Sequence, residues 1–145
     1  MRRSDYLRLL CVLAACLVLC GCGAGDPLGR RAIRGNVTLD GVALDSGTIH
    51  FEPQGPSAVH GSGTVILNGA YEMSAEHGLP AGSYKVSISA PEAMEQTAVM
   101  GQELPPPAER VPAEYNVATR LVAEVTDSGP NRFDYNLQSA GNPPE

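Results

Sequence analysis

Apolar and polar residues alternate along most of the chain after residue 32. In the first such run, Ile33, Gly35 and Val37 fall on one side, whereas Arg34 and Asn36 fall on the other. A period of two is typical of β-strands that bury one face. Further runs of this kind cover residues 42–44, 48–52, 64–67, 70–73, 83–90, 121–125 and 132–137. Because no segment keeps a helical period over three turns, the sequence predicts an all-β domain.

Turn residues separate these runs. Asp40-Gly41 and Asn68-Gly69 favour two-residue hairpins, because both dipeptides readily adopt positive φ angles. Pro53, which lacks a backbone N–H, is expected to end the run that contains Phe51. Short strands joined by such turns predict a seven-stranded Greek-key sandwich over residues 33–138, followed by a disordered tail over 139–145.

The alternating pattern disappears between residues 91 and 119, a proline-rich and acidic segment. Insertions of this length in a compact domain are usually functional or disordered. Tyr115 with Asn116 is the candidate binding surface, because an aromatic ring with a polar tip can stack on a sugar or fill a partner's pocket. Two alternatives stay open: the insertion is mobile and lies over a sheet edge, or Tyr115 attaches it to the sandwich.

The first 22 residues have the pattern of a secretory signal peptide. Arg2 and Arg3 precede an apolar run over residues 9–19, and small residues lead to Cys22. The run is shorter than the roughly 20 residues that span a bilayer, which argues against a transmembrane helix. We therefore expect residues 1–21 to be a signal peptide and residues 22–32 to be a modified cysteine followed by a flexible tether.

Residues 19–22, Leu-Cys-Gly-Cys, resemble the lipobox of bacterial lipoproteins. The resemblance implies that Cys22 receives a diacylglyceryl thioether, that the chain is cut before it, and that the new amine is acylated, for example with palmitate. Two or three acyl chains would hold the protein durably on a membrane. A competing lipobox at residues 13–16 would leave an unusually short apolar region. The expected location is the bacterial cell envelope, facing the periplasm or the exterior.

Charge and cysteine usage limit the partners of the domain. The chain has 10 basic and 16 acidic residues, a formal net charge of −6. Cleavage before Cys22 would remove three of the basic and one of the acidic residues, leaving 7 and 15 and a charge of −8. Such a surface does not favour nucleic acid. The cut also removes Cys11, Cys16 and Cys20, so no thiol remains for a disulfide or a metal site.

Candidate metal ligands and catalytic residues are sparse. His50, His60 and His77 lack the paired spacing of zinc ligands, and we expect them to be exposed to solvent. Met94 and Met100 could bind Cu(I) with a histidine, but loop methionines usually make only apolar contacts. The glycines beside Ser62 do not complete a phosphate loop or a nucleophile motif. We predict no metal, no cofactor and no catalytic residue.

Several motifs together resemble the carboxypeptidase regulatory-like domain, a transthyretin-like sandwich, in the version carried by small bacterial lipoproteins. They lie at residues 35–41, 47–53, 69–71, 79–86, 111–116 and 131–137. The resemblance implies this fold for most of the mature chain and implies no activity. The Tyr-Arg-Gly-Ser end of transthyretin-like hydroxyisourate hydrolases is absent. Lys85 is expected to face solvent, which argues against the core isopeptide bond of some adhesin domains.

These observations favour a non-catalytic, lipid-anchored envelope module that mediates protein interaction or scaffolding. Its expected partners are the membrane, through the N-terminal lipid, and an envelope protein. The alternative is a lipoprotein that binds carbohydrate or cell wall through Tyr115. A metal-binding or hydrolytic periplasmic protein is a third possibility, which would depend on His50 or His77.

Overall fold

The computed structural model describes residues 26–56, 60–93 and 106–139. These residues form strands and one short 3-10 helix, with no α-helix among them. The elements are β1 (Ile33–Leu39), β2 (Val42–Ala43), β3 (Ser46–Gln54), β4 (Ser62–Leu67), β5 (Ala70–Met73), β6 (Gly82–Ser89), η1 (Ala113–Tyr115), β7 (Leu121–Val125) and β8 (Tyr135–Leu137). The prediction of an all-β fold is confirmed. No helix in these three ranges is long and apolar enough to cross a membrane.

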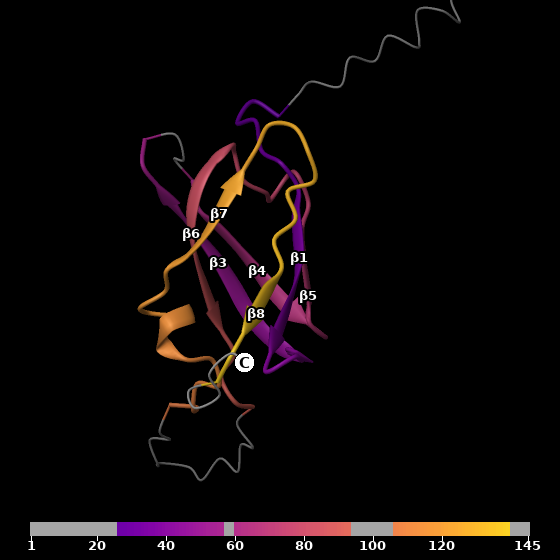
Figure 1. The fold of residues 1–145 in the computed structure, drawn as a ribbon. Coiled ribbons are helices and arrows are strands. Elements are labelled where there is room, and N and C mark those ends of the chain that lie inside the picture. Colours follow the sequence, from indigo (N-terminus) through magenta and orange to yellow (C-terminus); the bar gives the residue numbers. More distant parts are fainter. Residues whose placement is uncertain (1–25, 57–59, 94–105, 140–145) are drawn as a thin grey trace, which may run out of the picture.

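The strands form one curled sheet with the order β2-β1-β5-β4-β3-β6-β7, in which neighbours are antiparallel. β8 lies outside this path and pairs in parallel with β1. The first half of β1 pairs with β5, whereas its second half pairs with β2 and β8. Because β1 changes partners along its length, the sheet folds over, and β8 lies in front of β3 and β4 in Figure 1.

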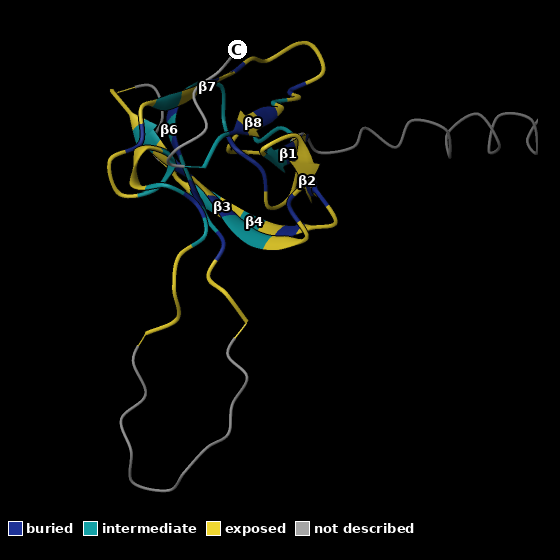
Figure 2. Ribbon diagram, turned by 60° about the horizontal axis from the view of Figure 1, so that its bottom comes forward, coloured by how far each residue is buried: buried dark blue, intermediate teal, exposed yellow. Residues whose placement is uncertain are grey.

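The core lies inside this curl and follows the predicted alternation. On β6, Tyr84, Val86 and Ile88 are fully buried, and on β3 Ile49 and Phe51 are buried. Figure 2 shows exposed positions alternating with buried or intermediate ones along β4 and the middle of β3. The other buried apolar residues are Ile33, Val37, Leu44, Ile66, Tyr71, Met73, Leu79, Ala90, Val111, Ala123, Val125, Tyr135 and Leu137. The predicted inward faces of these strands are therefore confirmed.

Both predicted tight hairpins are present. Asp40 and Gly41 have φ angles of 52° and 78° between β1 and β2. Asn68 and Gly69 have φ angles of 51° and 76° between β4 and β5. Positive φ at both central positions defines the type I′ turn, whose twist matches that of antiparallel strands.

Pro53 does not end its strand, contrary to the prediction. β3 continues to Gln54, and Pro53 pairs with Tyr84 of β6. The pairing of β3 with β4 ends earlier, at Phe51 opposite Ser62. Pro53 therefore lies beyond the ladder with β4, and a proline without an N–H is compatible with a strand edge that is unpaired on one side.

The last predicted strand is shorter than expected. Only Tyr135–Leu137 forms β8, although the alternation begins at Arg132. The Asp134 carboxylate accepts a 2.7 Å hydrogen bond from the Asn36 N–H, and the Phe133 N–H donates to the Arg34 carbonyl. The Asp134 carboxylate thus takes the place of a backbone carbonyl as the partner of the Asn36 N–H, and the regular pairing with β1 is interrupted here.

Residues 26–32, the described part of the tether expected from the sequence, make several contacts. The Asp26 carboxylate accepts hydrogen bonds from the backbone and the guanidinium of Arg30. Arg31 exchanges backbone hydrogen bonds with Leu79, and its guanidinium forms an ion pair with Asp127. The first set of bonds lies within residues 26–30, whereas Arg31 attaches the segment to the end of the sheet where β1 begins, which we call the β1 pole. Cys22 and the expected signal peptide lie outside the described residues.

Candidate functional site

The described ends of the 91–119 insertion are attached to the sheet. Pro91 and Glu109 form a β-bridge, Val111 is buried, and the buried Thr119 hydroxyl donates a 2.6 Å hydrogen bond to the Val86 carbonyl. Residues 106–120, together with the end of β6, form what we call the η1 pole. These contacts concern only the two ends of the insertion, because residues 94–105 lie outside the described ranges.

Glu109 organises this pole. Its carboxylate accepts hydrogen bonds from the Ser89 hydroxyl, from the backbone N–H groups of Ala90 and Val111, and from the Asn116 amide. Burial opposes the charged form of Glu109, but the hydrogen bonds outweigh it, so the pKa of this carboxyl lies below its usual value. The charged Glu109 carboxylate therefore links the end of β6 to the segment around η1.

Arg110 adds a second attachment on the β3 side. Its guanidinium donates to the carbonyls of Ala90, at 3.1 Å, and Ser46, at 3.0 Å. It also forms a 2.8 Å ion pair with Asp45. The hydrogen bond from Arg110 is the main cause of the lowered pKa of Asp45. Successive residues of the insertion thus bind two different strands, which fixes the position of η1.

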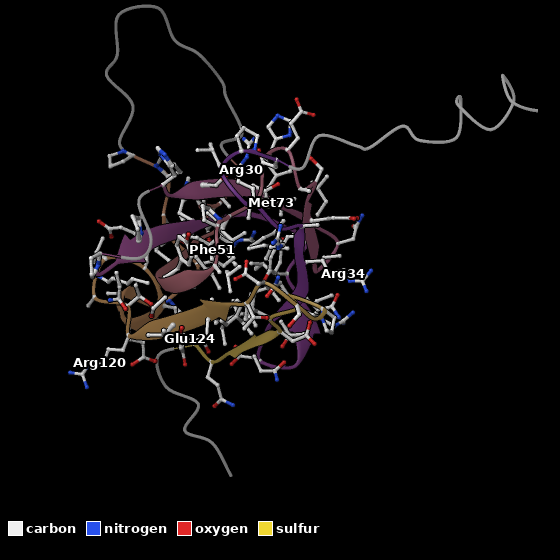
Figure 3. All side chains as sticks on the ribbon, turned by 90° about the horizontal axis from the view of Figure 1, so that it is seen from above. Arg30, Arg34, Phe51, Met73, Arg120 and Glu124 are labelled. Carbon is white, nitrogen blue, oxygen red and sulfur yellow. The ribbon has the colours of Figure 1, made fainter. Side chains whose placement is uncertain are left out.

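A shallow hollow of about 500 Å³ lies beside η1. It is lined by Glu114, Tyr115, Ala118 and Arg120. Tyr115 is only partly buried and packs against the core, so one ring both attaches η1 and lines the hollow. Figure 3 shows the Arg120 side chain pointing away from the body of the domain.

The structure separates the two residues of the predicted binding surface. Tyr115 lines the hollow, whereas the Asn116 amide points to Glu109 and holds the loop. Glu114 and Arg120 were missed by sequence reasoning, because no periodic pattern marks which residues of an irregular segment surround an aromatic ring. The hollow offers an aromatic face, a carboxylate and a guanidinium, a combination that can hydrogen-bond and stack on a polar ligand.

The three histidines are exposed and belong to different parts of the fold. His50 is on the outer face of β3, His60 precedes β4, and His77 is in the connection between β5 and β6. The Ser74 hydroxyl lies 3.2 Å from Nδ1 of His77 within one turn. Among the described residues, no group of three or more histidine, cysteine or acidic side chains is placed to hold a metal ion.

The described residues define the class of this molecule as an all-β protein with a curled, largely antiparallel sheet. Comparison with protein-family models, with curated proteins and with solved structures finds no match to this chain.

Proposed function

We propose that this protein is a non-catalytic, lipid-anchored module of the bacterial cell envelope that presents its η1 pole to a protein partner. For its fold we propose the Greek-key, transthyretin-like sandwich of carboxypeptidase regulatory-like domains, on the strength of the strand and turn motifs noted above. The proposed lipid is attached to Cys22, on the resemblance of residues 19–22 to a lipobox.

The observation that carries this proposal is the arrangement of the two poles. Arg31 is attached where β1 begins, and η1 lies at the other end of the domain (Figure 1). β6 connects these two ends with eight residues, a length of about 26 Å at the usual rise of a strand. Four residue steps separate Cys22 from Asp26 and span at most about 14 Å. A lipid on Cys22 would therefore hold the β1 pole near the bilayer and direct the η1 pole away from it.

A binding role is favoured over catalysis by the chemistry of the η1 hollow. Its lining residues are a glutamate, a tyrosine, an alanine and an arginine, and among the described residues neither the Glu114 nor the Tyr115 side chain has the hydrogen-bonded base that would activate a nucleophile. Rigid attachment of η1 through Glu109 and Arg110 lowers the conformational entropy that a partner would have to restrict. Presentation of a fixed surface is the activity that this geometry supports best.

Photo-crosslinking in cells tests this proposal. A crosslinking amino acid at Val117, 82% exposed beside η1, is expected to capture one specific protein. The matched control is Leu28, 48% exposed at the β1 pole, which should not capture it. The Cys22→Ala variant should lose both lipid attachment and the crosslink. Equal capture from the two positions, or no protein capture from Val117, would overturn the proposal.

Carbohydrate or cell-wall binding is the second candidate, and the Tyr115 ring with two charged neighbours favours it. This function predicts that the purified protein is retained by envelope polysaccharide. Arg120→Ala and Glu114→Ala should weaken retention without unfolding the domain, because both side chains are exposed. Retention that survives both of these changes and Tyr115→Ala would exclude the hollow as a sugar site.

A further inference from the structure

β7 is the last strand in the order of the sheet, so only one of its two sides is paired with a described strand. We call the other side the β7 edge. Proteins usually protect such edges by making them short, or with prolines, bulges or lysines. The five residues of β7 include no proline, glycine or lysine, and Val122 is 50% exposed. By contrast, β2 at the opposite end of the order has only two residues.

One end of the β7 edge is closed by a side chain. Thr126, directly after the strand, donates its N–H to Oδ1 of Asn131 over 2.9 Å, and its carbonyl accepts a hydrogen bond from the Asn131 amide over 3.0 Å. Asn131 is buried, with 8% of its surface exposed. Its amide takes the place of a neighbouring strand at Thr126, so the backbone groups of Thr126 point away from β6.

The rest of the β7 edge has no partner among the described residues. Alternate residues of a strand direct their N–H and C=O groups to the same side, so those of Val122 and Glu124 point the same way as those of Thr126. The N–H of Leu121 fits this alternation, because it bonds to the Thr119 hydroxyl on the β6 side. No described residue bonds to the outward backbone groups of Val122 and Glu124. Donors and acceptors in this row match the backbone of another extended chain.

The side chains along the β7 edge have a definite charge order. Arg120, Val122 and Glu124 are exposed and alternate with the partly buried Leu121 and the buried Ala123. Neither charged side chain forms a hydrogen bond or an ion pair with a described residue, and Arg120 points away from the domain (Figure 3). Opposite charges facing each other across two strands are stabilising, and like charges are destabilising. An antiparallel strand that suits this edge therefore has a basic, an aliphatic and an acidic residue at alternate positions, in that order.

A second copy of this chain does not suit the β7 edge. Parallel pairing of β7 with itself would bring the two Arg120 side chains together, and likewise the two Glu124 side chains. Antiparallel pairing would match the charges, but β7 runs from the η1 pole to the β1 pole (Figure 1). The β1 poles of the two copies would then lie at opposite ends, where their lipids could not enter one membrane. A strand from another protein meets neither obstacle.

We infer that the partner of this protein adds an antiparallel strand with this charge order to the β7 edge. The inference rests on the proposed function, since the strand belongs to the protein that binds at the η1 pole, where β7 begins. In strand addition the main-chain hydrogen bonds provide affinity, and alternate side chains provide specificity. The outward groups of Val122 and Glu124 bond to the added backbone, while Arg120 and Glu124 face side chains of opposite charge.

The first test measures peptide binding to the full chain in phosphatidylcholine nanodiscs, with one copy per disc. The probe is the fluorescein-labelled peptide Thr-Arg-Thr-Val-Thr-Glu-Thr, and fluorescence anisotropy should show saturable binding. In the antiparallel register its valine faces Val122, so methylation of the valine nitrogen removes a hydrogen bond and should weaken binding at least about tenfold. Methylation of the next threonine nitrogen, which points away from β7, is the matched control and should leave binding unchanged.

The second test exchanges charges. A peptide with its arginine and glutamate exchanged should bind the unchanged protein at least about tenfold more weakly than the first peptide. The double variant Arg120→Glu, Glu124→Arg should reverse this preference. The control Arg34→Glu, Glu72→Arg, which exchanges two exposed charges on β1 and β5, should not.

The outcomes separate this inference from the proposed function. No saturable binding, full binding of the valine-methylated peptide, or the same preference in both proteins would overturn strand addition and leave crosslinking from Val117 untouched. In cells, a crosslinking amino acid at Val122 should capture the protein that Val117 captures. Capture of a second copy from Val122 would overturn the inference. Peptide binding without any protein captured from Val117 would instead overturn the proposed function.

Discussion

The hydroxyl of Tyr71 donates a 2.7 Å hydrogen bond to the carbonyl of Phe133, two residues before β8. The bond joins β5 to a segment 62 residues further along the chain. It passes beside Gly35 of β1, where an added Cβ would lie 1.7 Å from the Phe133 oxygen and 2.8 Å from the Tyr71 hydroxyl. Burial raises the pKa of Tyr71 far above its usual value, so the hydroxyl keeps its proton as a donor at physiological pH.

Tyr71→Phe tests the importance of this bond. The change keeps the ring and leaves the Phe133 carbonyl without this donor, so the free energy of unfolding should fall by about 1–3 kcal/mol. Urea denaturation followed by circular dichroism measures it. Tyr115→Phe is the control, because Tyr115 is partly exposed and its hydroxyl makes no hydrogen bond to the described residues. Equal losses in the two variants would contradict the role given to Tyr71.

Gly35→Ala should be more damaging than Tyr71→Phe. The new methyl group would collide with the Phe133 carbonyl, so β1 and the segment before β8 would have to separate. We expect the free energy of unfolding to fall by about 3 kcal/mol or more, at the upper end of the cost of overpacking a core. Thermal unfolding measures it. The double variant Gly35→Ala, Tyr71→Phe should stay strongly destabilised, since the backbone oxygen is the closest atom; full recovery would show that the hydroxyl alone excludes the methyl group.

Gly69→Ala and Gly41→Ala form a matched pair for the hairpin turns. Both glycines have positive φ angles in type I′ turns, so the free energy of unfolding should fall by about 1–2 kcal/mol in both variants. An added Cβ at Gly69 would also lie 2.6 Å from Cβ of Ala43, whereas at Gly41 nothing lies within 4 Å. Gly69→Ala should therefore be the more destabilising of the two in urea denaturation. If Gly41→Ala destabilises the protein as much as Gly69→Ala or more, the contact with Ala43 does not contribute to the cost of the Gly69 change.

Acid should destabilise the protein, because several carboxyl groups have lowered pKa values in the folded state and become protonated as the pH falls. The pKa of Asp26 is lowered to about 2, mainly by its hydrogen bonds with Arg30, and those of Asp45, Glu109 and Asp134 are also lowered. Lowered pKa values stabilise the folded state above the unfolded values of 3.8 and 4.5, and this stability is lost as the pH falls through the folded values.

Thermal unfolding at pH 7, 4 and 2 measures this effect. We expect the melting temperature to fall mainly between about pH 4.5 and pH 2. Glu109→Gln should lower the melting temperature at pH 7 and should reduce the further drop in acid, because the variant has no proton to gain at this position. A melting temperature that does not change between pH 7 and pH 2 would contradict the role of these carboxylates.

The strands and hairpins could be predicted from the sequence because the forces that set them are local. Alternation along residues 83–90 assigns each side chain to a face, and β6 has these faces. Asn68-Gly69 tolerates the positive φ angles of a type I′ turn, and the turn forms there. The prediction that Pro53 ends its strand was wrong, because a missing N–H interrupts a strand only where a neighbouring strand would accept a hydrogen bond from it.

By itself, the sequence determined where most of the strands lie, which face their side chains take and where the tight hairpins reverse the chain, since neighbouring residues decide these features. Only the tertiary structure decided that β8 runs parallel to β1, that Glu109 joins η1 to β6, and that Arg34 lies beside Arg132. These contacts join residues far apart in the chain, and a period of two does not specify which strand pairs with which. The hollow beside η1 is lined by one short segment, and only the contacts of Glu109 and Arg110 with β6 and β3 fix where that segment lies on the sheet.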